Sequence, residues 1–177
     1  MTASKLPPVT LILGGARSGK SSYAERLAEG RPGACIYLAT ATAGDAEMTA
    51  RIAEHRRRRG ARWRTHEAPL DLMAALETAA DPAAVVLVDC LTLWLSNVLL
   101  ANIDVEKQCE LLVSTLPRLA GPVIFVSNEV GLGIVPDNAL ARRFRDAAGR
   151  LNQAVAAAAQ SVVFVAAGLP LVLKQAD

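Results

Sequence analysis

The strongest constraint on the fold is a glycine-rich segment, residues 14–21, which follows the pattern G-x-x-x-x-G-K-S/T. An apolar, β-branched run, Val9–Leu13, precedes it, and a segment of helical composition, Ser21–Ala28, follows it. Strand, glycine loop and helix in this order are typical of a phosphate-binding loop, because glycines let successive backbone N–H groups point at phosphate oxygens. The helix adds its positive N-terminal dipole. A nucleoside triphosphate is therefore the expected ligand. The residues assigned to it are Gly14, Gly15, Ala16, Arg17, Ser18, Gly19, Lys20 and Ser21.

Three side chains are predicted to act on the phosphates directly. Lys20 is expected to reach the outer phosphates, and Ser21 is expected to ligate Mg²⁺. A second Mg²⁺ ligand should be an acidic residue at the end of another buried strand, and Asp89 follows the apolar run Ala84–Val88. Asp89 is also placed to cap the helix that follows, which is compatible with metal binding.

The rest of the chain alternates apolar runs with helical segments. The apolar runs are too continuous for strands with one wet face, which favours buried parallel strands. This alternation predicts an α/β fold with a mainly parallel sheet flanked by helices. Since no Pro/Gly/Ser-rich linker divides the 177 residues, residues 1–177 are expected to form a single nucleotide-binding catalytic domain. The expected strands are Val9–Leu13, Ala34–Ala39, Ala84–Val88, Val123–Ser127 and Ser161–Ala166. The expected helices are Ser21–Ala28, Glu47–Arg58, Leu70–Ala79, Leu91–Leu100, Val105–Leu116 and Asn138–Ala159.

Composition bears on where the protein works. The residues are 52% hydrophobic and 20% charged, which excludes intrinsic disorder. The longest nearly apolar stretch, Val162–Leu173, contains Gly168 and Pro170 and is shorter than the ~18 residues of a membrane span. The N-terminus is unlike a secretory signal, and the three cysteines form no C-x-x-C motif. A cytoplasmic protein with no membrane span is expected.

A basic cluster surrounds one of the two histidines. Seven of the fifteen arginines lie between Arg51 and Arg64. On a helix, His55 would share one face with Arg51, Arg58 and Arg59, which lie four residues before it and three and four after it. Nearby guanidinium charges lower a histidine pKa, so this ring would be neutral and nucleophilic near pH 7. It could then attack phosphorus while the arginines stabilise the transferring group. The alternative is a surface histidine beside solvated arginines.

Two further positions have less specific interpretations. Glu129 follows the run Val123–Ser127 and opens a glycine-containing loop, residues 130–136. Such a loop either borders a substrate at the carboxyl edge of the sheet or is only a turn. Glu129 is a candidate base for hydroxyl activation. His66, on an expected strand after Trp63, is assigned a structural or exposed role.

Several blocks together resemble the bifunctional adenosylcobinamide kinase / adenosylcobinamide-phosphate guanylyltransferase family of cobalamin biosynthesis. The resemblance spans nearly the whole chain, and these blocks in this order are highly specific. The blocks are Gly14–Ser21, Asp45–Met48 with Arg51-Ile52, His55 with Trp63–Glu67, Asn128–Pro136, and Phe144–Gln153.

The resemblance implies a RecA-like P-loop fold and two successive reactions. In the first, ATP or GTP phosphorylates the aminopropanol hydroxyl of adenosylcobinamide. In the second, GTP transfers GMP to a histidine at the position of His55, and the GMP passes to adenosylcobinamide phosphate to give adenosylcobinamide-GDP. The resemblance also implies a homotrimer, with Mg²⁺ as cofactor. Outside residues 14–21, the nucleotide contacts that it implies are Ala39, Thr40, Ala41, Arg56, Arg57, Arg58, Arg59, Glu67 and Asp89.

Two other functions fit parts of the pattern. A single-activity P-loop kinase for another small alcohol would leave His55 incidental and would form no covalent nucleotide adduct. A GTP-dependent switch or a nucleic-acid-binding protein would use the arginines on phosphates. However, none of the four lysines lies in the N/T-K-x-D pattern of switch GTPases, and 4% aromatic residues offer few platforms for base stacking. No nucleic-acid partner is expected.

Overall fold

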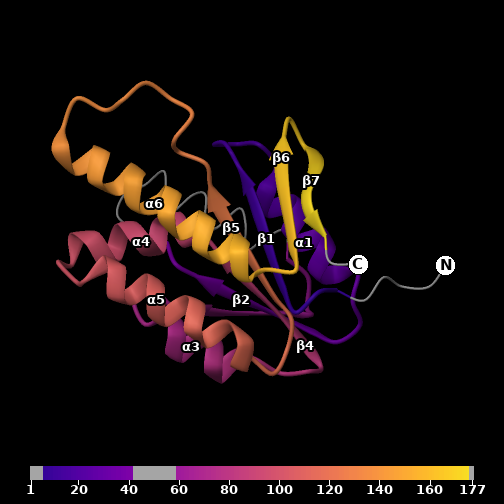
Figure 1. The fold of residues 1–177 in the computed structure, drawn as a ribbon. Coiled ribbons are helices and arrows are strands. Elements are labelled where there is room, and N and C mark those ends of the chain that lie inside the picture. Colours follow the sequence, from indigo (N-terminus) through magenta and orange to yellow (C-terminus); the bar gives the residue numbers. More distant parts are fainter. Residues whose placement is uncertain (1–5, 42–58, 176–177) are drawn as a thin grey trace.

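Seven strands pair into one sheet in the order β3-β2-β4-β5-β1-β6-β7, as seen in the computed structural model, which describes residues 6–41 and 59–175 (Figure 1). Strands β1 to β6 are parallel, and β7 runs antiparallel to β6 at one edge. The strands are β1 (Val9–Gly14), β2 (Ala34–Ala39), β3 (Trp63–Glu67), β4 (Ala84–Asp89), β5 (Val123–Asn128), β6 (Ser161–Ala166) and β7 (Leu169–Gln175). The helices are α1 (Lys20–Glu29), α3 (Leu72–Ala79), α4 (Leu91–Leu100), α5 (Val105–Thr115), the 3₁₀ turn η1 (Leu116–Arg118) and α6 (Ala139–Ala158).

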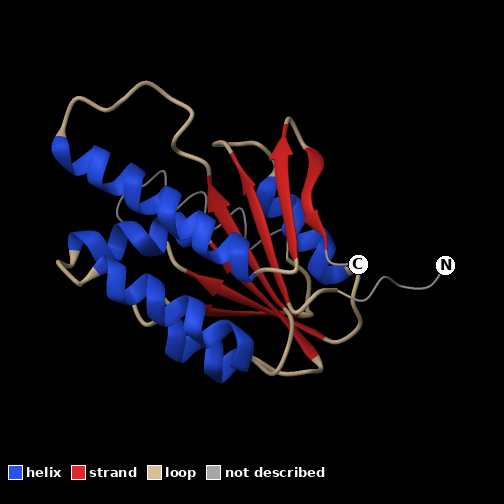
Figure 2. Cartoon of the chain, viewed as in Figure 1, coloured by secondary structure: helices blue, strands red, loops and turns tan. Residues whose placement is uncertain are grey.

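Helices cover both faces of the sheet, which is why the central strands are apolar at consecutive positions (Figure 2). Along β1 and β5, alternate side chains enter two different cores. Leu11 and Phe125 pack with residues of α3, α4, α5 and α6. Ile12 and Ile124 point to the other face, where they pack with residues of α1. The α/β architecture predicted from the sequence is confirmed.

The predicted strands and helices within the described residues are also confirmed, with boundaries that differ by at most two residues. The predicted helix Glu47–Arg58 lies outside the described residues. The sequence analysis missed β7, because the apolar stretch Val162–Leu173 has no polar break. Ala167 and Gly168 both have positive φ (50° and 79°), and this two-residue turn folds the stretch into a hairpin. Within residues 6–41 and 59–175, no helix has the length and hydropathy needed to cross a bilayer.

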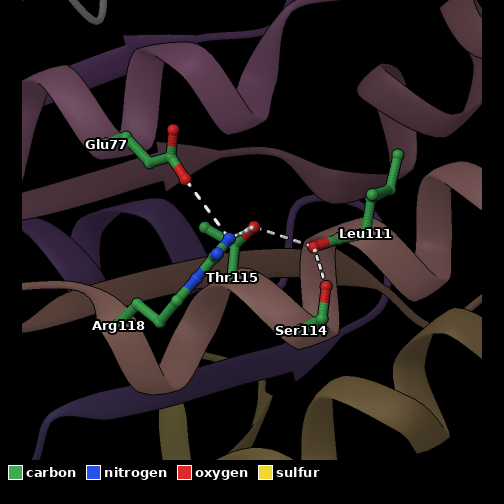
Figure 3. A network of polar contacts seen from close by, with 5 residues as sticks. All are labelled: Glu77, Leu111, Ser114, Thr115 and Arg118. Atoms are coloured by element: carbon green, nitrogen blue, oxygen red, sulfur yellow. Dashed lines mark hydrogen bonds and ion pairs between the residues drawn. The ribbon is translucent and has the colours of Figure 1, made fainter.

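A polar network ties α3 to the end of α5, where the chain turns into β5 (Figure 3). The Arg118 guanidinium lies 3.4 Å from the Glu77 carboxylate, with both side chains exposed. The hydroxyls of Ser114 and Thr115 donate to the Leu111 carbonyl at 2.9 and 2.8 Å. An exposed ion pair of this kind contributes at most about 1 kcal/mol. The network precedes β5 and so lies at the amino end of the strands, away from the glycine loop.

Candidate active site

The glycine loop joins the end of β1 to the start of α1, and its backbone requires glycine at two positions. Gly14 has φ +155°, and a Cβ there would overlap the Val165 carbonyl oxygen and lie 2.7 Å from Ser18 Oγ. Gly19 has φ +96°, and a Cβ there would lie 3.1 Å from the Gly168 Cα. The two glycines therefore serve close approach of the backbone, as the motif predicts.

The loop contains a buried lysine side chain and a buried hydroxyl. Lys20 Nζ donates to the Gly15 carbonyl at 2.6 Å, and the lysine side chain is buried. The hydroxyl of Ser18 is buried too and, among the residues that the structure describes, has no hydrogen-bond partner. A cation and an unsatisfied donor at the start of α1 together form an environment suited to phosphate oxygens.

The C-terminal hairpin holds the glycine loop in place. The Gly168 N–H, in the turn between β6 and β7, donates to the Ser18 carbonyl at 2.8 Å. The backbone of Gly168 is also the group that a Cβ on Gly19 would meet first. The sequence analysis did not anticipate this contact. The available signal was Gly168 followed by Pro170, which marks a turn inside the apolar stretch.

The predicted residues beyond the loop converge on the carboxyl edge of the sheet. Ala39, at the end of β2, is in register with Glu67 on β3 and with Asp89 on β4. On the other side of β5, Gly14 is in register with Asn128, and the next residue, Glu129, donates its N–H to the Gly14 carbonyl at 3.0 Å. Glu67, Ala39, Asp89, Glu129 and the glycine loop therefore lie along one edge, as expected of a parallel sheet.

Tyr37 on β2 links the Arg59 side chain to this edge. The guanidinium carbon of Arg59 lies 3.5 Å from the centre of the buried Tyr37 ring, and Arg59 Nη1 donates to Thr65 Oγ1 at 3.2 Å. Burial, followed by the nearby Asp89 carboxylate and a hydrogen bond to it, raises the pKa of Tyr37 far above its usual value, and Arg59 opposes this shift. Sequence reasoning missed Tyr37, which carries no motif. His55 and Arg56–Arg58 lie outside the described residues.

Thr40 is committed to the protein interior. Its hydroxyl accepts from the Cys90 N–H at 2.7 Å and donates to the Cys90 carbonyl at 2.8 Å. Asn97 Nδ2 donates to the Thr40 carbonyl at 2.9 Å. The side chain of Thr40 therefore fixes the chain just after Asp89, a role that the sequence analysis did not anticipate. Its predicted contact with nucleotide, like that of Ala41, stays a prediction.

A second buried network fixes the end of β5. Ser127 Oγ donates to Asn152 Oδ1 at 2.7 Å and lies 3.3 Å from Thr92 Oγ1. The Asn128 N–H donates to Thr92 Oγ1 at 2.7 Å, and Asn152 Nδ2 donates to the Asn128 carbonyl at 3.2 Å. Side chains from α4 and α6 thus hold the backbone directly before Glu129.

His66 lies on β3 and its side chain is exposed, one of the two positions that the sequence analysis allowed for it.

The residues predicted to hold Mg²⁺ provide few ligands of their own. Ser21 lies in the first turn of α1, and Asp89 ends β4. Within the described parts of the chain there is no cluster of three or more His, Cys, Asp or Glu side chains suited to a metal. Mg²⁺ commonly takes one or two protein oxygens and completes its shell with phosphates and water. One hydroxyl and one carboxylate beside a phosphate cradle therefore fit this ion.

The fold and this edge define a P-loop nucleotide-binding protein with a RecA-like sheet. Solved structures support the fold alone. The P4 protein of bacteriophage phi6, in complex with ADP, aligns with a TM-score of 0.50 and 16% identity over 92% of this chain, and this chain spans about half (52%) of that chain. A second solved structure, an ATPase domain, aligns with a TM-score of 0.50 and 14% identity, covering 88% of this chain and 68% of that one.

Sequence comparison then identifies the family. A family profile described as cobinamide kinase / cobinamide phosphate guanyltransferase matches residues 10–173. The bifunctional adenosylcobalamin biosynthesis protein CobP of Pseudomonas aeruginosa is 55% identical, with 93% of this chain and 96% of CobP covered. CobU of Salmonella typhimurium, a protein of the same description, is 40% identical, with 93% of this chain and 98% of CobU covered. The chain belongs to the cobinamide kinase / cobinamide phosphate guanyltransferase family and is a bifunctional enzyme of cobalamin biosynthesis.

Proposed function

We propose that both activities use the glycine loop and that His55 carries GMP between GTP and adenosylcobinamide phosphate. The observation that carries this proposal is the position of Arg59. The Arg59 guanidinium lies on the ring of Tyr37, and the Asp89 carboxylate is close to the same tyrosine. Asp89 and the glycine loop lie at the same edge of the sheet. Arg59 is four residues from His55, so the chain needs to cover only a short distance to bring the imidazole to a bound triphosphate.

The kinase step transfers the γ-phosphoryl group of ATP or GTP. The aminopropanol hydroxyl of adenosylcobinamide attacks the γ-phosphorus, the bond to the β-phosphate oxygen breaks, and ADP or GDP leaves. Lys20, held in the loop by the Gly15 carbonyl, would neutralise charge on the transferred group. Glu129 would accept the hydroxyl proton, since its backbone N–H is bonded to Gly14 beside the phosphates.

The guanylyl transfer proceeds in two displacements. The neutral imidazole of His55 attacks the α-phosphorus of GTP, a P–N bond forms, and pyrophosphate leaves. A phosphate oxygen of adenosylcobinamide phosphate then attacks the same phosphorus, the P–N bond breaks, and adenosylcobinamide-GDP is released. A covalent intermediate divides one difficult transfer into two easier ones. Arg56–Arg59 would stabilise the charge that develops on the phosphates.

Mg²⁺ fits this scheme as a cofactor that Ser21 and Asp89 hold together with the phosphates. When bound, it would offset the negative charge of the nucleotide. Besides burial, the nearby Asp89 carboxylate raises the pKa of Tyr37, so this tyrosine would be a neighbour of the proposed metal ligand. Ala39, Thr40, Ala41 and Glu67 complete the proposed nucleotide-binding edge.

We also propose that residues 1–177 act as one catalytic domain, in a cytoplasmic homotrimer without a nucleic-acid partner. The single continuous sheet across the described residues supports one domain. Light scattering coupled to gel filtration measures the assembly directly, and a monomeric mass would contradict the trimer.

The guanylylated histidine is tested with GTP labelled at the α-phosphate. The expected result is label on the protein that survives alkali and is lost in acid, as for a phosphoramidate. His55→Ala should abolish the label. His66→Ala is the matched control, because His66 is an exposed histidine on β3 and should leave the label intact. Label on the His55→Ala protein would refute the assignment.

A shared glycine loop is tested with Lys20→Ala. Since the lysine is buried in the only proposed phosphate cradle, both the kinase rate and the guanylylation rate should fall by orders of magnitude. Full kinase activity in this variant would show that the two reactions use different sites. If the wild-type protein acquires no label but phosphorylates cobinamide, the chain acts as a kinase alone.

A further inference from the structure

The loop between β5 and α6 begins beside the glycine loop and exposes large apolar side chains. We call residues Val130–Pro136, together with Leu140 in the first turn of α6, the apolar loop. Leu132 is 83% exposed, Ile134 97%, Val135 64% and Leu140 54%. Figure 1 shows this connection as a wide arch that leaves the carboxyl end of β5. Large exposed apolar side chains grouped on one connection are typical of a binding site.

The two ends of the apolar loop are fixed, although its middle is exposed. At the first end, Glu129 Oε1 accepts from the Gly131 N–H at 2.6 Å, and the Glu129 N–H is bonded to the Gly14 carbonyl. At the other end, Arg142 Nη1 donates to the carbonyls of Pro136 and Asp137 at 2.8 and 2.7 Å. Fixed ends reduce the entropy that the loop loses on binding, which favours recognition of a ligand.

The contact between Glu129 and Gly14 places the apolar loop beside the glycine loop. The phosphates of the nucleotide do not explain its side chains, because phosphates are recognised by N–H groups, cations and hydroxyls. The second substrate of this family does explain them. Cobinamide carries a wide corrin ring with a methyl-bearing periphery, and its reactive hydroxyl lies at the end of a long side arm. A site for it needs an apolar surface about one side arm away from the phosphates.

We propose that the corrin ring of cobinamide packs on the apolar loop while its aminopropanol arm reaches the glycine loop. This inference rests on the cobinamide activities of the family and assigns the corrinoid a surface of its own. Leu132, Ile134 and Val135 provide the contact area, and the Glu129–Gly14 hydrogen bond sets the distance between ring and phosphates. Removal of this apolar area from water on binding provides the affinity.

The test compares Leu132→Ser and Ile134→Ser with controls on β7. Leu171→Ser and Leu173→Ser remove equally large apolar side chains, 61% and 57% exposed, from the edge strand. In kinase assays, the loop variants should raise the KM for cobinamide at least tenfold and leave the KM for the nucleoside triphosphate unchanged. The β7 variants should change neither. Ile134→Met keeps an apolar side chain, so its KM for cobinamide should equal that of the wild type.

Equilibrium dialysis with cobinamide alone gives a second measurement that is independent of turnover. The dissociation constant should rise by the same factor in the loop variants. An unchanged KM and dissociation constant would overturn the proposal. So would a loop variant that raises both KM values and forms a smaller assembly in gel filtration, because the loop would then be a contact between copies of the chain. A wild-type protein that binds no cobinamide would instead overturn the family function itself.

Discussion

The guanidinium of Arg59 stacks on the ring of Tyr37, with its central carbon 3.5 Å from the ring centre. Burial, together with the nearby Asp89 carboxylate, raises the pKa of the same tyrosine. One aromatic side chain therefore contacts Arg59, a proposed phosphate ligand, and lies near Asp89, a proposed metal ligand. The stack and a hydrogen bond to Thr65 fix the Arg59 side chain against β2 and β3.

The Arg59–Tyr37 stack should be measurable as an interaction energy. In a double-mutant cycle of Arg59→Ala and Tyr37→Leu, we expect a coupling of about 0.5–1 kcal/mol in the free energy of unfolding, the usual range for a partly exposed cation–π pair. Urea denaturation of the four proteins gives this value. Tyr37→Phe is the control, because it keeps the ring and should preserve the coupling. Strictly additive effects would show that the stack contributes nothing.

Thr40 should contribute to stability through its hydroxyl alone. Thr40→Val leaves the Cys90 N–H without its 2.7 Å acceptor, while the Cys90 carbonyl loses the 2.8 Å hydroxyl donor but keeps the Trp94 N–H at 3.1 Å. We expect a loss of about 1–3 kcal/mol in the free energy of unfolding, the cost of one buried backbone group without a partner. Thr40→Ser retains both hydrogen bonds and should lose less than half as much. Equal losses in the two variants would assign the effect to packing.

The sequence was sufficient to predict the elements that have a strong local signal. The glycine loop, Asp89 and the five central strands each combine a motif or an apolar run with a definite neighbour in the chain, so their positions on the sheet follow from α/β topology. Glu67 was placed by family resemblance, and register with Ala39 brings it to the same edge.

The contacts missed by sequence reasoning join residues that are distant in the chain. Tyr37 and Arg59, Thr40 and Cys90, and Ser18 and Gly168 meet only when the sheet has formed. No spacing rule indicates such pairs, because the two partners belong to different elements of the fold. Strand β7 was missed for a different reason, because its hairpin turn contains alanine where asparagine or glycine is usual.

Gly14 should tolerate no side chain. In Gly14→Ala, the new Cβ would overlap the backbone carbonyl of Val165 in β6 and crowd Ser18 Oγ. We expect a loss of about 2–4 kcal/mol in the free energy of unfolding, together with loss of triphosphate binding. Gly15→Ala is the matched control for stability, because no atom lies within 4 Å of a Cβ at that position. Thermal melts of both variants measure this difference in stability. A Gly14→Ala protein as stable as the wild type would contradict the prediction.

At Gly149, by contrast with Gly14, substitution by alanine should stabilise the protein. It lies inside α6, where a Cβ would have no atom within 4 Å, so alanine fits the helix without a clash. Because alanine loses less conformational entropy in a helix, Gly149→Ala should raise the free energy of unfolding by about 0.5–1 kcal/mol. Urea denaturation measures this gain. A destabilised variant would show that the surface of α6 near Gly149 needs a bare backbone.

Cys109, on α5, should be a slow nucleophile at neutral pH. Burial, followed by the Glu106 carboxylate, raises the pKa of Cys109 to about 11, while Arg150 opposes the shift. At pH 8 its thiolate fraction is roughly two orders of magnitude below that of a free thiol of pKa ~8.5. Alkylation by iodoacetamide, followed by peptide mass spectrometry, should be slower by that factor and should accelerate tenfold per pH unit up to about pH 10.

The same shift makes the protein less stable in alkali. Because the pKa is raised in the folded state, the unfolded chain releases the proton first. The stabilisation is therefore complete below about pH 8.5 and is lost as the pH rises toward 11. Cys109→Ala should flatten the decline of unfolding free energy across this interval. An unchanged slope would show that other groups control alkaline unfolding.

The neighbours of Cys109 provide variants with effects of opposite sign. Glu106 and Arg150 form an exposed ion pair at 3.5 Å, and each acts on the thiol with its own charge. Glu106→Gln removes a negative charge, so it should lower the Cys109 pKa and accelerate alkylation about two- to threefold. Arg150→Gln should slow alkylation by a similar factor. Both effects should fade in 1 M salt, where the screening length falls to about 3 Å. Rate changes of the same sign in the two variants would mean that altered access to the thiol, and not charge, governs its reactivity.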